Sequence, residues 1–303
     1  MTKRKGFSVI KKIFAIVHAV FFNTGIFAAH YQADTSKKPL PAALEKKNPA
    51  GPVIKEANVI FPAILSGNEE QSLDYVEKFS ENRRAYLIRT YNKGQKLFPQ
   101  AAAILKLRQL PQELKVLLAL ESAFRANAVS KAGAVGYWQF MDKVAREYGL
   151  KIVHPLTAAE KKKLVRKDKK KAALIFKAMA RQRDDRKNFI KSTHAAARYL
   201  QDRSRNLNND ILLMVASYNC GVGNVWDAIA ASGKSNPTFW DIKSLLPAET
   251  RSYVMNFIAL NVIYNNYDKF SNNTLAFRPV TRKADNFETN VTEELGQEIP
   301  RKR

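Results

Sequence analysis

Cysteine is almost absent from this sequence, and histidine is scarce. Cys220 is the single cysteine among 303 residues, so no intramolecular disulfide can form, and a small apolar role is expected for its side chain. The four histidines, at positions 18, 30, 154 and 194, show no ligand spacing, and no glycine-rich phosphate loop follows a strand. Neither metal nor nucleotide chemistry is therefore expected, and no cofactor is predicted.

Strand-like alternation and internal repeats are also missing. Apolar residues recur instead at helical spacing through much of the chain. The hydrophobic content of 46% is that of a globular protein. The sequence therefore predicts an all-α fold, with one sizeable domain and appendages.

Acidic residues are in deficit. The chain has 27 Asp and Glu against 51 Lys and Arg, which gives a formal net charge of +24. Such an excess implies a polyanionic partner or surface. Nucleic acid, anionic lipid and the acidic bacterial cell wall all meet this requirement, and charge alone does not choose among them.

The N-terminal residues predict export. Basic residues as far as Lys12 precede the apolar run Ile13 to Phe22, and small residues lead to Ala29, so residues 1–29 are expected to be a secretory signal peptide. The expected location is the periplasm or cell envelope, which argues against nucleic acid as the partner. An uncleaved signal would tether the protein to the membrane. No cysteine lies near the cleavage site, so a lipoprotein is not expected.

Composition divides the remainder of the chain into three parts. Residues 30–67 are polar, contain several Lys and Pro, and read as a flexible linker. Residues 68–270 carry the helical patterns and are expected to form the folded domain. Residues 271–303 turn polar and charged, which predicts a disordered tail.

Glu121 stands out within this domain. It falls on the same helical face as Leu114, Leu117 and Leu118. Burial there disfavours the carboxylate and raises its pKa, unless the group is paired or hydrogen-bonded. One interpretation is a structural glutamate bonded to a backbone N–H or to Arg125, and the other is a catalytic acid.

The residues after Glu121 favour the catalytic interpretation. Ser130, Gly133 and Gly136 interrupt the helical pattern, and aromatic, amide and thioether side chains crowd positions 137–141, as a sugar site requires. The run Glu121-Ser122, Ser130, Gly133-x-x-Gly136-x-Trp138-Gln139 resembles the signature of lytic transglycosylases with a goose-type-lysozyme-like catalytic domain.

Later segments continue this resemblance in the same order, so that it covers roughly Leu73 to Tyr267. They are Asp184-Asp185-Arg186, Ala216-Ser217-Tyr218-Asn219-Cys220-Gly221, Phe239-Trp240-Asp241 and Leu246-Pro247-x-Glu249-Thr250-x-x-Tyr253-Val254. Asp142 and Val144, where Pro and Thr are common in the family, and Ser217 before Tyr218 depart from the usual pattern. These departures concern loop geometry and substrate fit.

The resemblance implies a lysozyme-like domain that acts on the glycan strands of peptidoglycan. The expected reaction cleaves the MurNAc-GlcNAc bond without water and leaves 1,6-anhydroMurNAc ends. Glu121 would be the catalytic acid and base, and no metal would take part. The residues expected to bind substrate or hold Glu121 are Ser130, Gly136, Gln139, Met141, Tyr218, Asn219, Glu249 and Tyr253.

Two alternatives remain at this stage. A hydrolytic muramidase on the same fold needs a second carboxylate to direct water. The sequence offers Asp142, Glu147, Asp184 and Asp185 for that role. The other alternative is a non-catalytic basic protein that binds the cell wall.

A Lys-rich segment, about 153–183, fills a gap that family members cross with few residues, so the resemblance implies an insertion. Few helix breakers lie between Ala158 and Asp184, which predicts a helix. This helix would either contact an anionic surface of the cell envelope or be a solvated helix packed on the domain through its apolar side.

Overall fold

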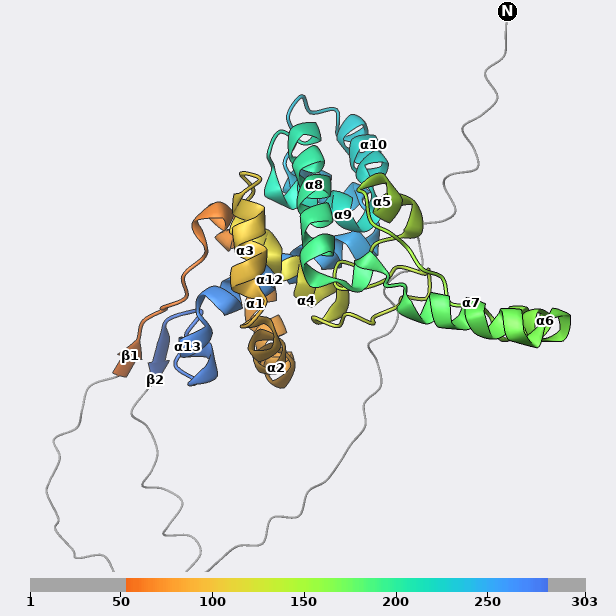
Figure 1. The fold of residues 1–303 in the computed structure, drawn as a ribbon. Coiled ribbons are helices and arrows are strands. Elements are labelled where there is room, and N and C mark those ends of the chain that lie inside the picture. Colours follow the sequence, from red (N-terminus) through yellow and green to blue (C-terminus); the bar gives the residue numbers. More distant parts are fainter. Residues whose placement is uncertain (1–52, 283–303) are drawn as a thin grey trace, which may run out of the picture.

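The computed structural model describes residues 53–282 and shows a helical domain with one small two-stranded ribbon (Figure 1). The predicted all-α fold is confirmed. The α-helices are α1 (Glu69–Asn82), α2 (Arg84–Gly94), α3 (Phe98–Lys106), α4 (Leu117–Ser122), α5 (Asp142–Glu147), α6 (Ala158–Lys167), α7 (Lys169–Arg181), α8 (Phe189–Asn206), α9 (Ile211–Cys220), α10 (Val222–Ser232), α11 (Phe239–Ile242), α12 (Ala248–Asn265) and α13 (Tyr267–Ser271). Short 3₁₀ helices are η2 (Ala63–Leu65), η3 (Gln112–Val116), η4 (Asp185–Lys187) and η5 (Lys243–Leu245). The strands β1 (Val53–Lys55) and β2 (Val280–Arg282) pair antiparallel, with Ile54 opposite Thr281.

Helices α12 and α9 form the centre of the domain. Almost every residue of α12 from Tyr253 to Ile263 is buried, and α12 packs against α1, α4 and α9. Pro247 immediately precedes α12, at a position that tolerates a residue without an N–H. The carboxylate of Asp210 caps α9 by accepting the N–H groups of Leu212 and Leu213, both at 2.9 Å. Because α9 and the part of α12 from Tyr253 onward are apolar on most sides, the other helices must enclose them.

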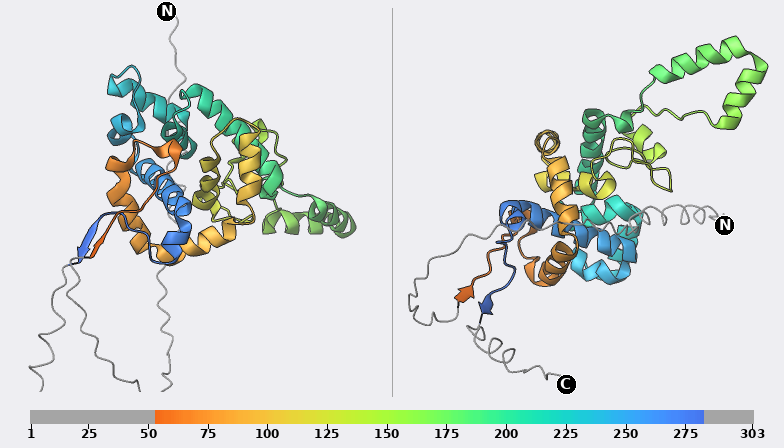
Figure 2. Two further views of the ribbon diagram at one scale, coloured as in Figure 1. Left: turned by 90° about the vertical axis from the view of Figure 1, so that its left-hand side faces the viewer. Right: turned by 90° about the horizontal axis from the view of Figure 1, so that it is seen from below.

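Helices α6 and α7 form a hairpin that projects from the body of the domain (Figures 1 and 2). We call residues 158–181 the arm. A capping box between Thr157 and Glu160 begins α6. Asp168 interrupts the single helix that the sequence predicted, because its carboxylate accepts the N–H of Lys171 at 2.9 Å and starts α7. Leu174 is 69% exposed, so part of the apolar side of α7 faces solvent.

A buried arginine anchors the chain where the arm joins the domain. Arg186 is 2% exposed, and its guanidinium pairs with Asp184 at 2.7 Å and with Asp142 at 2.5 Å. Burial alone would raise the pKa of Asp184, but the bonds from Arg186 outweigh it, so this pKa is lowered. His154 also contacts Asp142, at 2.8 Å from Nε2. This network fixes the end of the arm to the start of α5.

The folded domain extends beyond the boundaries predicted from sequence at both ends. Leu65, within the predicted linker, is fully buried, and the Ile60 N–H donates to Asn266 Oδ1 at 3.0 Å. Ala276 and Phe277, within the predicted tail, pack on the domain. Residues 59–65 are an apolar run interrupted by Pro62, and residues 275–277 are three apolar residues before Arg278. Both runs are too short to show a period by which sequence analysis could assign them to the domain.

Three predictions fall wholly or partly outside the described residues. They are the signal peptide at 1–29, the linker before residue 53 and the tail after residue 282. Within residues 53–282, no helix combines the length and the apolar character that a membrane span needs.

Candidate active site

Glu121 lies in the last turn of α4, directly before a sharp reversal of the chain. The helix ends at Ser122, and both Ala123 and Phe124 adopt left-handed backbone conformations, with φ of 46° and 62°. The Ser122 hydroxyl donates to the carbonyl of Tyr137 at 2.8 Å, which ties the end of α4 to the loop that follows.

The Glu121 carboxyl meets a phenol from the central helix. Tyr253, which is buried in α12, donates its hydroxyl to Glu121 Oε1 at 2.5 Å. Burial raises the pKa of Glu121 to about 8; the Tyr253 hydrogen bond opposes this rise, and the exposed carboxylate of Glu249 adds to it. Glu121 is therefore mostly protonated at neutral pH, which suits a general acid.

The raised pKa argues against a purely structural role for Glu121. A carboxylate that is neutralised by an arginine has a lowered pKa, not a raised one. Arg125 directs its Nε to the carbonyl of Ser122 at 3.0 Å. The sequence-based prediction of a raised pKa thus agrees with the direction found here.

Three tyrosines surround Glu121. Burial raises the pKa values of Tyr199, Tyr218 and Tyr253, and the negative charge of Glu121 raises them further. Tyr218 donates its hydroxyl to the carbonyl of Trp138 at 2.8 Å, and the rings of Tyr199 and Tyr218 pack edge to face. Phenols with raised pKa values stay neutral and act as hydrogen-bond donors. Sequence analysis did not assign Tyr199 to the site, although it lies on the buried face of α8.

The loop from residue 128 to 141, here called the glycine loop, has a shape set by three of the predicted site residues. Gly136 has φ of +88°, and a Cβ there would lie 2.0 Å from the carbonyl oxygen of Arg186, so only glycine fits. The Ser130 hydroxyl accepts the N–H of Ala134 at 3.0 Å. Gln139 donates its amide to the carbonyls of Gly136 and Ala128, at 2.8 and 3.2 Å.

The expectation that the aromatic residues of this loop present faces to a sugar is wrong for two of them. Trp138 is 0% exposed and Phe140 is 3% exposed, so neither can stack on a ligand. The Trp138 indole donates to Thr193 Oγ1 at 3.0 Å, which fixes the loop on α8. Tyr137 and Met141 are half-buried and keep some surface available.

Asn219 and Glu249 come from the ends of two neighbouring helices. Asn219, near the end of α9, accepts the hydroxyl of Thr250 at its Oδ1 atom, at 2.8 Å. Thr250 was not predicted as a site residue, although it follows Glu249 directly within the segment that carries the resemblance. The structure therefore brings Tyr253, Tyr218 and Glu249 around Glu121, and holds Asn219 beside them through α12.

Three of the four carboxylates considered for directing water are engaged elsewhere. Asp142 and Asp184 pair with Arg186. Asp185 accepts the Lys191 ammonium at 2.7 Å and a backbone N–H at 3.0 Å. Glu147 is exposed at the end of α5. Among residues 53–282, no group of three or more His, Cys, Asp or Glu side chains is placed to hold a metal ion.

Residues 98–239 match the family model described as the transglycosylase SLT domain. The chain is 34% identical over 172 residues to membrane-bound lytic murein transglycosylase D from Escherichia coli K12, and equally to that from Escherichia coli O6:H1 strain CFT073. Each match covers 56% of this chain and 31% of the relative, so the chain spans about a third of the length of these proteins. Among solved structures, an inactive mutant of lytic transglycosylase Slt from Pseudomonas aeruginosa is 22% identical, with a TM-score of 0.37 over 58% of this chain and 24% of that one.

Proposed function

Because the chain carries a transglycosylase SLT domain, we propose that it is a peptidoglycan lytic transglycosylase. It cleaves the bond between N-acetylmuramic acid and N-acetylglucosamine and leaves 1,6-anhydroMurNAc ends. The observation that supports this most is the carboxyl of Glu121, which is held protonated at neutral pH beside a neutral phenol.

Glu121 is the proposed catalytic residue for both halves of the reaction. It first donates its proton to the glycosidic oxygen, while the acetamido carbonyl of the substrate assists departure of the leaving sugar. As a carboxylate it then takes the proton of the muramoyl 6-hydroxyl, whose oxygen closes the anhydro ring. The proton is returned within each cycle, so one carboxyl group suffices and no water is consumed.

The other site residues have two proposed tasks. Tyr253 holds Glu121 in place and, with Glu249, sets its pKa. Tyr218, through its bond to the Trp138 carbonyl, positions the glycine loop against α9. The exposed edges of this loop and of Asn219 then bind the glycan, and the loop residues expected to take part are Ser130, Gln139 and Met141. Gly136 is buried against Arg186 and contributes through the shape of the loop.

The hydrolytic alternative has less support. A water-directing carboxylate must be available near the acid, and Asp142, Asp184 and Asp185 are held in ion pairs around the base of the arm. Glu147 and Glu249 are the exposed carboxylates that are left for this role. The non-catalytic alternative does not explain why a glutamate is held with its pKa near 8.

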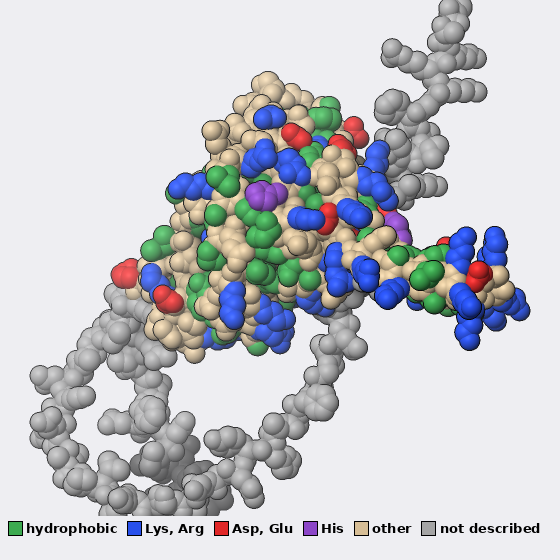
Figure 3. All heavy atoms as spheres, viewed as in Figure 1, with side chains coloured by type: hydrophobic (Ala, Val, Ile, Leu, Met, Phe, Trp, Pro, Cys, Tyr) green, Lys and Arg blue, Asp and Glu red, His purple; other side chains and the backbone are tan. Residues whose placement is uncertain are grey.

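We also propose that the protein is exported to the cell envelope and that the arm contacts an anionic surface there. Residues 158–181 contain ten Lys and Arg and two acidic residues. Basic side chains cover the end of the arm in the space-filling view (Figure 3). Leu174 and Val165 are 69% and 41% exposed beside these charges, and basic charge with exposed apolar side chains suits an anionic interface.

The function is tested by the variant Glu121→Gln, which keeps the shape of the side chain but cannot exchange a proton. We expect release of 1,6-anhydromuropeptides from purified peptidoglycan to fall by about 10,000-fold or more, because general acid–base groups contribute roughly 100- to 10,000-fold and one residue serves both steps. Binding to insoluble glycan should persist. Glu81→Gln, the same change at an exposed residue of α1, is the control and should behave as the wild type.

Mass spectrometry of the products separates the candidate functions. Anhydro ends support the transglycosylase. Products that end in a reducing muramic acid would make the protein a hydrolase, and residual activity above about a tenth of the wild-type rate in Glu121→Gln would remove Glu121 from the mechanism.

A further inference from the structure

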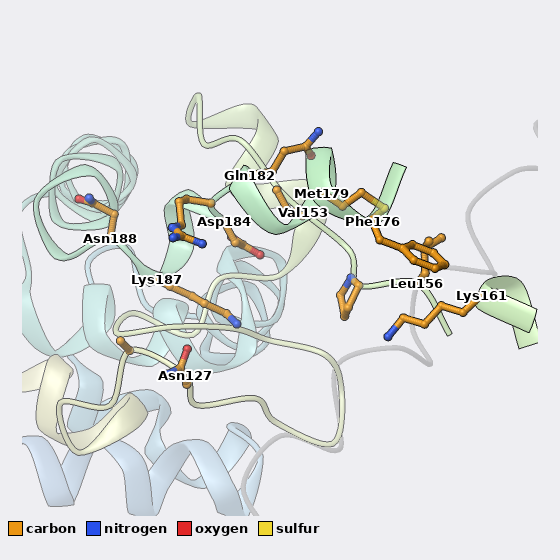
Figure 4. A pocket seen from close by; sticks show the side chains of 13 residues that line it. Asn127, Val153, Leu156, Lys161, Phe176, Met179, Gln182, Asp184, Lys187 and Asn188 are labelled. Carbon is orange, nitrogen blue, oxygen red and sulfur yellow. The ribbon is translucent and has the colours of Figure 1, made fainter. Parts of the chain in front are cut away.

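A hollow of about 960 Å³ lies between the base of the arm and the body of the domain (Figure 4). It does not include Glu121, but it is bordered by Ala126 and Asn127, in the chain segment that leads from α4 into the glycine loop. Its volume lies in the range of small-molecule binding sites. Nothing in the proposed cleavage chemistry requires this hollow.

The walls of the hollow divide into an apolar part and a basic part. Leu156, Phe176 and Met179 supply apolar surface from the arm and the segment that precedes it. Lys161 extends into the hollow from the arm, and Lys187 extends into it from the body (Figure 4). Two ammonium groups that approach one space from opposite walls form a site for a ligand with negative charge.

The remaining charged groups do not cancel this preference. The carboxylate of Asp184 also borders the hollow, but it is bonded to the Arg186 guanidinium at 2.7 and 3.0 Å. Arg183 is a further basic lining residue. Asn188, which caps the 18-residue helix α8, borders the hollow as well, so the positive end of that helix dipole lies beside it.

We infer that this hollow binds the acidic peptide that branches from the glycan strand of peptidoglycan. Such peptides carry several carboxylates and small methyl side chains, which match opposed lysines and an apolar wall. The hollow is bordered by Ala126, five residues after Glu121 along the chain, so a branch of a glycan bound at Glu121 would extend toward it. This inference rests on the proposed function for the identity of the ligand.

With this ligand, the arm takes part in substrate selection as well as in contact with a surface. The arm contributes Lys161, Phe176 and Met179 to the hollow, and the body contributes Lys187 and Asn127. Glycan that carries peptides should therefore bind more tightly than glycan without them.

The test combines a direct binding measurement with kinetics. The probe is the synthetic peptide L-alanyl-γ-D-glutamyl-diaminopimelyl-D-alanine, acetylated at its N-terminus and titrated calorimetrically into the full chain. The comparison is the same peptide amidated at its carboxylates, which lacks negative charge and keeps one amino group. We expect the acidic peptide to bind and the double variant Lys161→Glu with Lys187→Glu to weaken binding about tenfold or more, since two charge interactions become repulsive. The double variant Lys167→Glu with Lys177→Glu makes the same charge change on the arm outside the hollow and should bind as the wild type.

Kinetics on two soluble substrates completes the test. Glycan strands that retain their peptides are compared with the same strands after an amidase has removed them. The Lys161/Lys187 variant should raise KM about tenfold on the first substrate and leave the second unchanged.

The two possible failures are distinguishable. Equal binding of the acidic and amidated peptides, or equal KM changes on both substrates, would overturn the inference while leaving the cleavage reaction intact. A wild-type protein that binds the acidic peptide through these lysines but cleaves neither glycan would refute the proposed function and leave the inference standing.

Discussion

Replacement of Glu121 by glutamine should stabilise the protein, and the gain should grow with pH. The pKa of Glu121 is raised from 4.5 to about 8 by burial, so the folded state binds a proton that the unfolded state releases throughout this window. Stability therefore falls as pH rises from about 4.5 to 8, where the folded carboxyl also ionises and the loss levels off. Glutamine cannot ionise and escapes this loss.

The size of the effect follows from the shift. At about 1.4 kcal/mol per pKa unit, the pH-dependent loss carried by Glu121 is on the order of 1 kcal/mol at pH 5, 3 kcal/mol at pH 7 and 5 kcal/mol at pH 9. For a domain of this size, each kcal/mol corresponds to roughly 2–4 °C in Tm. Glu121→Gln should thus melt roughly 6–12 °C above the wild type at pH 7.

Differential scanning calorimetry of the wild type, Glu121→Gln and Glu81→Gln at pH 5, 7 and 9 measures this directly. Glu81 is exposed on α1, so its variant should follow the wild-type pH profile of Tm. A Tm difference for Glu121→Gln that is the same at all three pH values would refute the reasoning. It would mean that the fold does not hold this carboxyl protonated, and the assignment of a general acid would lose its physical basis.

Further predictions concern the neighbours of Glu121 and the arm. The wild-type kcat/KM should fall as pH rises through about 8, where Glu121 loses its proton. Glu249→Gln removes a repelling charge and should move this midpoint to lower pH. Tyr253→Phe removes a hydrogen bond to the carboxylate and should move the midpoint to higher pH. An unchanged midpoint in the pH–rate profiles of both variants would contradict these causes. Charge reversal of the six arm lysines should weaken sedimentation with phosphatidylglycerol vesicles and preserve cleavage of short soluble glycans from which the peptides have been removed. Wild-type vesicle binding that is insensitive to salt would show instead that the arm is a packing element. The six lysines are Lys161, Lys162, Lys163, Lys169, Lys170 and Lys171.

Local chemistry allowed much of the fold to be predicted from the sequence. A capping residue, Asp210, stands directly before the apolar run that forms the enclosed helix α9, and Pro247 stands directly before α12, so both helix starts carry a local signal. The break at Asp168 was missed because a lone aspartate among lysines reads equally well as a helix residue. Its role as a cap depends on a backbone conformation, φ of −163°, that the pattern does not reveal.

The site was less accessible to sequence analysis than the fold. Helical spacing placed Glu121 on a buried face, but its partners Tyr253 and Glu249 come from α12, far along the chain. The family resemblance predicted Tyr253 and Glu249 as site residues, and helical spacing alone could not have done so. Trp138 and Phe140 show the opposite error, since their aromatic character suggested sugar contacts while their burial makes them supports of the glycine loop.

Backbone strain next to Glu121 explains why so many buried contacts converge on one short loop. Ala123, Phe124 and Gln139 all have positive φ, and such conformations in residues other than glycine cost on the order of 1–3 kcal/mol each. They persist only where the surroundings determine the backbone more strongly than its own preference. The Ser122 hydroxyl on the Tyr137 carbonyl and the Gln139 amide on two loop carbonyls supply that constraint. Packing elsewhere in the domain must offset the free-energy cost of the strain and of burying the Glu121 carboxyl. Helix α12 is suited to this, because it has a long continuous buried surface and also carries Tyr253. A site so constrained holds Glu121 ready before substrate arrives, which is what a single residue acting first as acid and then as base requires.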